Sequence, residues 1–159
     1  MLAPVGFEST RERVRAAVGC MSALQLLLEK KGYGTEMGDE GGFAPALATN
    51  DEALDLLVSA IAQAGYTTDQ IKIALDIAAS SLYKSGRYTF RVGGKEQLID
   101  KKQILVWYAA LAKKYPLISI EDGFAEDDWD GFVMLEKEMG DMLYIVGDDL
   151  TVTNAERID

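Results

Sequence analysis

The sequence predicts an α/β fold built on parallel strands, and three neighbouring segments carry that prediction. The apolar runs 117–120 and 142–146 are typical of short strands, and each leads directly into a pair of carboxylates. Segment 127–139 between them has apolar residues at helical spacing behind an acidic first turn, which favours a helix. A strand–helix–strand unit makes its strands parallel, and right-handed crossovers predominate. Both acidic pairs are therefore expected at one end of the sheet, where parallel α/β folds place their chemistry.

The first part of the chain is expected to be mainly helical. Ser9 opens a capping box, and a helix follows that ends at Gly32. Its apolar stripe is expected to comprise Val14, Val18, Met21, Leu24, Leu27 and Leu28. The run 38–45 holds three glycines and a proline around two acids, which predicts a loop. A second capping box at 49–52 starts a helix that stops at Gly65.

The second part alternates strands with helices. Residues 71–78 are expected to form a strand with Asp76 near its far end, and 101–115 a helix that Asp100 caps and Pro116 ends. Segment 83–98 is polar and is interpreted as an excursion from the main architecture. It is expected to contain one short strand at 88–92 that turns at Gly93 and Gly94. Further weak strand candidates lie near Leu2 and Tyr33, and Asn154 opens another expected helix.

Composition excludes several classes of function. The 159 residues, 48% hydrophobic and 26% charged, suit one soluble domain. A net charge of −10 argues against nucleic acid or anionic membranes as partners, because both attract basic surfaces. Histidine is absent, which excludes Ser-His-Asp and Cys-His catalysis within this chain and disfavours zinc. The single cysteine, Cys20, is expected to be a buried, inert thiol in a reducing compartment, and the absence of a long apolar run or a signal peptide favours the cytoplasm.

Three acids at the ends of successive strands form the candidate site. Asp76, Glu121 and Asp148 each lie where a predicted core strand ends. Neighbouring strands lie about 4.8 Å apart, so these carboxylates can converge on one ion. Without a proton or a divalent cation they would repel one another. Oxygen ligands alone select Mg²⁺ or a similar hard ion, which the sequence therefore predicts as the cofactor.

Four ordered segments resemble the signature segments of enolase (phosphopyruvate hydratase). They are 38–45 (GDEGGFAP), 74–80 (ALDIAAS), 119–122 (SIED) and 146–154 (VGDDLTVTN). The resemblance covers nearly the whole chain, and four segments in this order are far more specific than one glycine motif. It implies a partial (β/α)8 barrel of the TIM type with roughly half of the strands. Residues 1–159 would be a single partial C-terminal barrel domain, without the N-terminal capping domain or the end of the barrel.

The resemblance also implies a reaction and a role for each acid. Enolases reversibly remove water from 2-phosphoglycerate to give phosphoenolpyruvate in glycolysis, usually as cytoplasmic homodimers. By resemblance, Asp76, Glu121 and Asp148 would bind the Mg²⁺, and Glu121 and Asp148 would contribute to substrate binding. Glu40 would protonate the departing hydroxyl, which requires an environment that raises its pKa. In the family the lysine base lies beyond residue 159, so the isolated chain is expected to be inactive.

Other interpretations remain beside this one. The chain could be a non-catalytic enolase-like fragment that acts by binding or assembly, or another metal-dependent member of the barrel superfamily. Glu40 could belong to a solvated turn. Asp122 and Asp149 are expected to form hydrogen bonds or to face a helix N-terminus rather than bind metal. The two later helices carry aromatic residues that are expected to pack in the core or between helix and sheet rather than to form a binding platform, namely Trp107, Tyr108, Trp129 and Phe132.

Overall fold

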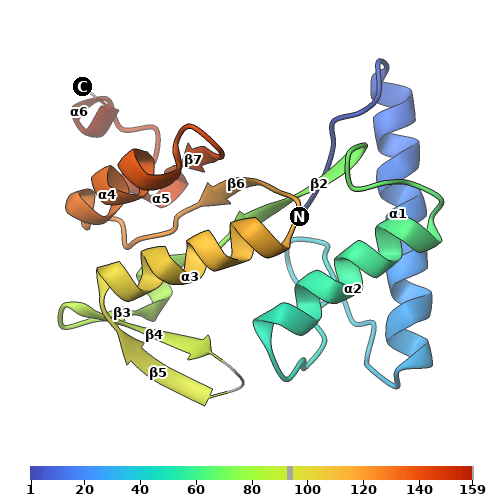
Figure 1. The fold of residues 1–159 in the computed structure, drawn as a ribbon, viewed down its shortest axis with the longest axis horizontal. Helices are drawn as coiled ribbons and strands as arrows, with labels where there is room; N and C mark the ends of the chain where they lie inside the picture. Colours follow the sequence, from blue (N-terminus) through green and yellow to red (C-terminus); the bar gives the residue numbers. More distant parts are fainter. Residues whose placement is uncertain (93–94, 159) are drawn as a thin grey trace. The chain divides into compact units, whose positions relative to one another are not determined.

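The computed structural model describes residues 1–92 and 95–158, with residues 91 and 92 described by their backbone alone. The turn expected at Gly93 and Gly94 lies outside the described residues. The chain forms two compact units, one of residues 2–72 and one of Met1 with residues 73–159 (Figure 1). Each unit is described by itself. Within the described residues, no helix has both the length and the apolar character needed to cross a bilayer.

The unit of residues 2–72 is built on two helices, α1 (Thr10–Lys30) and α2 (Asn50–Gln63). It also holds the short strand β1 (Leu2–Pro4) and the start of β2 (Ile71–Asp76). Ser9 forms the predicted capping box, because its Oγ accepts from the Glu12 N–H and the Glu12 carboxylate accepts from the Ser9 N–H. Gly32 follows α1 with φ +78°, which glycine adopts without the steric cost of a Cβ.

The buried face of α1 differs from the prediction. Of the predicted stripe, Leu28 is buried and Leu24 and Leu27 are partly buried, whereas Val14, Val18 and Met21 are 56%, 57% and 38% exposed. In the first half of the helix the covered face carries smaller residues instead, namely Ala16, Cys20 and Ala23. A pattern weighted by side-chain size favours the larger, exposed residues there. Small residues let the helix come close to Ile61 of α2 and Ile71 of β2 in one core cluster. Cys20 lies in this core as predicted, and burial raises the pKa of its thiol.

The cap of α2 and the segment near Tyr33 differ from the prediction, whereas the loop between them does not. Thr49 Oγ1 accepts from the Glu52 N–H, but the Glu52 carboxylate accepts from the Ala48 N–H and the Tyr33 hydroxyl, so only half of the predicted capping box forms. No strand forms near Tyr33. The run 38–45 is a loop, as expected, joined by a single bridge between Met37 and Phe43.

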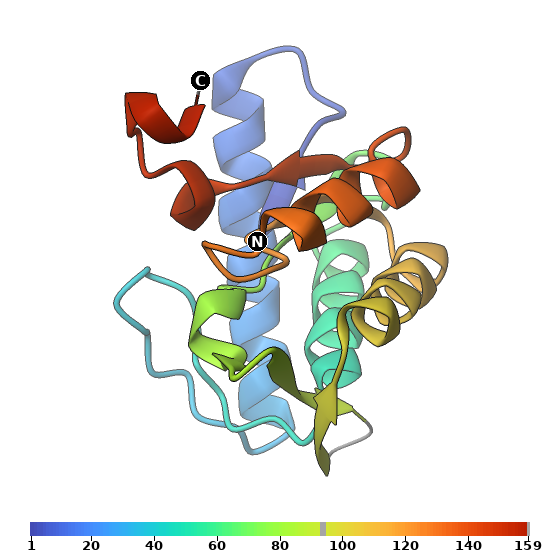
Figure 2. The same ribbon diagram turned by 90° about the vertical axis from the view of Figure 1, so that its left-hand side faces the viewer.

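The unit of residues 73–159 contains the parallel ladder β2–β6–β7, with β6 at Leu117–Glu121 and β7 at Tyr144–Val146. Helix α3 (Lys101–Lys114) leads into β6, and α4 (Trp129–Met139) connects β6 to β7, as Figures 1 and 2 show. The chain ends in the short helices α5 (Asp148–Thr151) and α6 (Ala155–Ile158). The fold is mixed α/β with a parallel sheet, and the described residues form no closed barrel; the fold-class prediction is confirmed.

The polar excursion forms a separate three-stranded antiparallel sheet rather than one short strand. Its strands are β3 (Tyr83–Lys84), β4 (Arg87–Val92) and β5 (Lys95–Ile99), which follow a short 3₁₀ helix, η1 (Ala79–Leu82). Tyr88 and Phe90 of β4 are buried in the main core with Tyr108 of α3. Trp129, which was expected to pack in the core or between helix and sheet, is 45% exposed at the start of α4, with the Arg157 guanidinium over its ring.

Candidate metal centre

Three strand ends of the parallel ladder lie side by side. The register pairs Asp76 of β2 with Glu121 of β6, and Glu121 with Val146 of β7. Asp148 follows β7 after one glycine and is the first residue of α5. Each of the three strands thus has an acid at its C-terminal end or in the turn after it. The crossover topology places these three acids at one edge of the sheet, which we call the rim.

A cluster of carboxylates occupies this rim. One carboxylate oxygen each from Glu121, Asp122 and Asp148 lies within 4.8 Å of the other two. Asp76 lies beside Glu121 in the register but contributes no oxygen to this group, and its Oδ1 accepts from the Ala78 N–H at 3.1 Å. The structure thus brings together two of the three predicted ligands and adds Asp122, while Asp76 stands next to them.

Asp122 is the buried member of the cluster. It is 4% exposed, and both carboxylate oxygens accept from the Asp149 N–H, at 3.2 and 3.1 Å. This is the hydrogen-bonding role expected for it. Burial raises the pKa of the Asp122 carboxyl above its ordinary 3.8, the Asp149 hydrogen bond acts in the opposite direction, and the carboxylates of Asp149, Asp76 and Asp148 add to the rise. The environment therefore disfavours the charged form of this side chain.

The rim backbone is held in an unusual conformation. Ala78, Asp122 and Val152 have φ of 47°, 45° and 40°, a left-handed region that costs a non-glycine residue about 1–3 kcal/mol. Such a conformation persists where its surroundings fix it. At Asp122 the N–H donates to Val146 O and the carbonyl accepts from the Ala79 N–H, both at 3.0 Å. The residue is thereby bonded to the end of β7 and to the first residue of η1, which follows β2.

The donors fit a hard divalent cation. The cluster offers carboxylate oxygens and no nitrogen or sulfur, which matches Mg²⁺ or Ca²⁺ better than zinc or copper. Like charges at this separation also destabilise one another unless a proton or a cation offsets them. The arrangement can therefore bind a divalent ion and hold it at an exposed edge of the sheet, because Asp148 is exposed.

Glu40, the predicted acid, lies in the other compact unit. It is exposed in a turn of the 38–45 loop, where the Gly38 N–H donates to Gly42 O and the Gly41 N–H to Gly38 O. Gly41 has φ +74°, so this turn requires glycine there. Its role as the acid stays a prediction.

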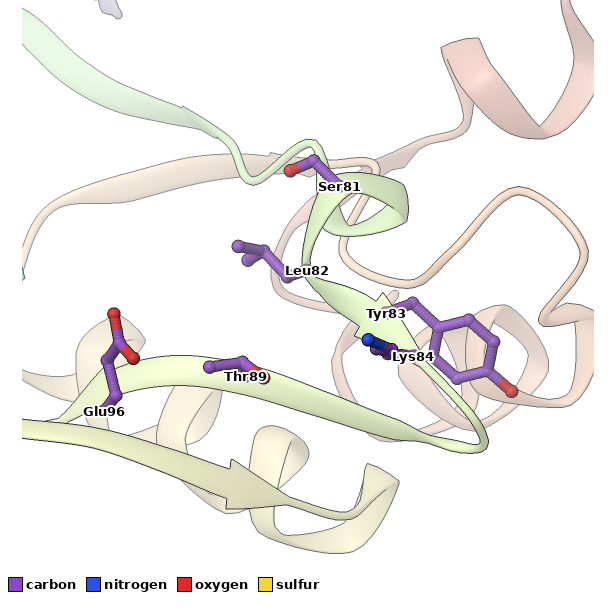
Figure 3. Close-up of a pocket in the computed structure, with 6 residues that line it drawn as sticks. All are labelled: Ser81, Leu82, Tyr83, Lys84, Thr89 and Glu96. Atoms are coloured by element: carbon purple, nitrogen blue, oxygen red, sulfur yellow. The ribbon is translucent and has the colours of Figure 1, made fainter.

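A pocket of about 410 Å³ lies elsewhere, at the start of the excursion (Figure 3). Its lining residues are Ser81, Leu82, Tyr83, Lys84, Thr89 and Glu96. None of the candidate site residues lines it, so the metal centre is a rim cluster rather than part of this pocket.

Sequence reasoning missed two features of the site. It placed Asp122 beside the ligands but not within their cluster, although its position directly after Glu121 was a signal. It also missed Arg157, whose guanidinium donates to the Asp127 carboxylate and to the backbone oxygens of Glu126 and Leu150. Arg157 thus joins the chain after α5 to the loop before α4, a contact over about thirty positions that no local pattern encodes.

Comparison with known proteins adds independent information. The family model described as "Enolase, C-terminal TIM barrel domain" matches residues 1–159. An enolase of a Nitratiruptor species is 43% identical over 155 residues, which are 97% of this chain and 36% of that protein. An enolase of Bdellovibrio bacteriovorus is 46% identical over 159 residues, 99% of this chain and 37% of that protein. The chain thus spans little more than a third of the length of these curated relatives.

Proposed function

The chain belongs to the enolase family, in its C-terminal TIM barrel domain, and from this membership we propose that it forms the metal-binding part of a Mg²⁺-dependent hydro-lyase. The reaction proposed is the reversible dehydration of 2-phosphoglycerate to phosphoenolpyruvate in glycolysis. The observation that carries the proposal is the carboxylate cluster at the strand ends, which supplies the oxygen donors that such an enzyme needs. We also propose that the longer protein is cytoplasmic and homodimeric, as the family likeness suggests.

The proposed ligands are Asp76, Glu121 and Asp148. Their support is the register, which aligns Asp76 with Glu121, and the short separation between oxygens of Glu121 and Asp148. When bound, the cation supplies positive charge that stabilises the negative charge developing on the substrate carboxylate as the neighbouring proton is lost. Glu121 and Asp148 would hold the ion and, through it, would contribute to binding the substrate carboxylate.

Glu40 donates a proton to the departing hydroxyl in this proposal. Its support is the family likeness of the 38–45 loop, in whose glycine turn the Glu40 side chain is exposed. No residue of this chain is proposed as the base. We therefore propose that the 159 residues alone do not turn over 2-phosphoglycerate, although they bind the metal.

Grafting the chain into a relative tests the proposal. The segment of the Bdellovibrio bacteriovorus enolase that matches residues 1–159 is replaced by this chain, and phosphoenolpyruvate formation is measured with 2-phosphoglycerate and Mg²⁺. The graft is expected to be active, and Asp148→Asn or Glu40→Gln within it is expected to remove most of the activity. Asp141→Asn, an exposed acid in the turn between α4 and β7, is the matched control and should leave activity unchanged. A folded graft that forms no phosphoenolpyruvate would contradict the proposed function.

A second candidate function is association with another polypeptide, which the exposed edge of β7 favours. This strand pairs with β6 and ends the order of its sheet, and its Tyr144 is 72% exposed. Unpaired strand edges associate, and a charge on the edge prevents it. Size-exclusion chromatography with light scattering should show oligomers of the purified chain that decrease on Tyr144→Lys. A monodisperse wild-type monomer would rule this candidate out.

A further inference from the structure

The loop from Asp122 to Asp128, between β6 and α4, is fastened at successive residues by side chains from other elements. Tyr108 of α3 donates its hydroxyl proton to Gly123 O at 2.8 Å. The Ala125 N–H donates to the hydroxyl of Tyr88 on β4 at 3.0 Å, and the Glu126 N–H to Ser80 Oγ of η1 at 2.9 Å. Glycine at position 123 gives this loop more backbone freedom than another residue would, but these bonds hold the loop from outside.

Tyr88 is the central member of these contacts. It is fully buried, and its hydroxyl both accepts from Ala125 and donates to Asp128 Oδ2 at 2.6 Å. Burial raises the pKa of this hydroxyl, so it keeps the proton that it donates. Its ring packs edge-on against Phe124 at 5.7 Å between centroids. One side chain therefore binds the middle of the loop and its last residue.

Asp128 extends the network to two helices. Its carboxylate caps α4 by accepting from the Gly131 N–H at 3.1 Å, and it pairs with Lys101 in the first turn of α3. Within the described residues, no buried side-chain nitrogen or oxygen lacks a hydrogen-bond partner. A fully satisfied buried network is rigid, and it fixes the groups attached to it.

The first residue of this loop is Asp122, directly after Glu121. The left-handed conformation of Asp122 stores strain that the chain would release if the loop could shift. Because Asp122 directly follows Glu121, a shift of the loop is expected to move the end of β6 and with it the Glu121 carboxylate relative to Asp148. Groups that hold ligands in place are known to affect metal affinity by about 10–100-fold.

We propose that Tyr88 is a positioning residue for the metal centre, acting through the 122–128 loop rather than by touching the ion. This proposal rests on the proposed metal site and adds to it a role for the antiparallel excursion. The excursion inserts Tyr88 into the core, where it fixes the loop that begins directly after the proposed ligand Glu121 and contains Asp122. Ser80 acts in the same way on Glu126.

Two measurements on the full 159-residue chain test this role. The first is the Kd for Mn²⁺, a probe for Mg²⁺, by titration calorimetry at a temperature where circular dichroism shows every variant to be folded. The second is amide hydrogen exchange of residues 122–126 without metal. The variants are Tyr88→Phe, Ser80→Ala and, as the matched control, Tyr83→Phe. Tyr83 lies on β3 with its ring 4.7 Å from that of Tyr88 and is 40% exposed.

Tyr88→Phe is expected to weaken Mn²⁺ binding about tenfold and to speed exchange of the Ala125 amide, because both effects follow from the lost hydroxyl. Ser80→Ala should act in the same direction on the Glu126 amide, and Tyr83→Phe should change neither. Faster exchange with unchanged Mn²⁺ affinity, or unchanged exchange, would overturn the positioning role. A wild-type chain that binds no Mn²⁺ would overturn the proposed metal site and, with it, any effect of Tyr88 on metal affinity. In that case the hydrogen-exchange data still show whether Tyr88 holds the loop.

Discussion

Neutralising one carboxylate at a time distinguishes the two possible sets of metal ligands. The proposed set contains Asp76, whereas the oxygens closest to one another include Asp122 instead. We expect Asp76→Asn to lose most of the Mg²⁺ binding and Asp122→Asn to keep it. Asp122 is buried, and both its oxygens already accept from the Asp149 N–H, so it has less freedom to bind an ion.

The size of each effect follows from the distances at the rim. At 4.8 Å, the upper limit of separation in the cluster, two unit charges repel by about 0.9 kcal/mol in water and about 3.5 kcal/mol at an effective dielectric constant of 20. Asp148 is exposed, so the lower figure applies to its repulsion with Asp122. An asparagine at 122 removes this repulsion and still accepts from the Asp149 N–H. The metal-free Asp122→Asn chain should gain about 1 kcal/mol of stability, or about 2–4 °C in Tm.

Bound metal should change the stability of the chain by more than the Asp122→Asn substitution does. A ligand at 100 times its Kd stabilises the folded state by about 2.7 kcal/mol, which is about 5–10 °C in Tm for a chain of this size. Thermal unfolding by circular dichroism at pH 7, with and without MgCl₂, measures both effects. Asp130→Asn, an exposed acid on α4 outside the cluster, is the control and should match the wild type. The reasoning is refuted if Asp122→Asn abolishes the Mg²⁺-induced rise while Asp76→Asn retains it.

Three further predictions concern stability. Asp128→Ala should cost about 3 kcal/mol in urea unfolding, because the buried Tyr88 hydroxyl loses the acceptor of its proton and the Gly131 N–H at the start of α4 loses its cap, while Asp130→Ala should stay within about 0.5 kcal/mol of the wild type. Gly131→Ala should cost about 2 kcal/mol, since its Cβ would lie 2.5 Å from Phe124 Cγ, whereas Gly42→Ala meets nothing within 4 Å and should be neutral or slightly stabilising; equal midpoints would show that the Phe124 ring yields. The pKa of Asp122 is raised in the folded chain, so protonation of this side chain favours the folded, metal-free state. The wild type should therefore lose stability relative to Asp122→Asn as the pH rises through that pKa, and the difference in stability between the two should disappear as the pH falls toward 3.8. A difference in stability that does not change with pH would contradict the raised pKa of Asp122.

Local patterns were sufficient to predict the elements that form the rim. The strand ends at Asp76 and Glu121 follow from apolar runs that stop at an acid, and the parallel ladder follows from the intervening helices. The caps at Ser9 and Asp100 form as predicted, because capping depends on residues three positions apart. The sequence predicted Asp76 as the third member of the cluster, whereas the structure places an oxygen of Asp122 there. Neighbouring residues Glu121 and Asp122 would alternate across a regular strand, and only the turn at φ +45° brings both carboxylates near Asp148.

The excursion shows why the remaining contacts could not be predicted. Its polar composition indicates an exposed sheet, and most of β5 is exposed, yet Tyr88 and Phe90 on alternate positions of β4 enter the core. The partners of Tyr88 lie 37 and 40 positions away at Ala125 and Asp128. Contacts at that separation are set by which strands and helices meet, which a one-dimensional pattern does not specify. In the folded chain the buried Ala125 N–H needs an acceptor, which a tyrosine at 88 supplies and a phenylalanine would not. The reason for a tyrosine at this position therefore exists only in the folded chain.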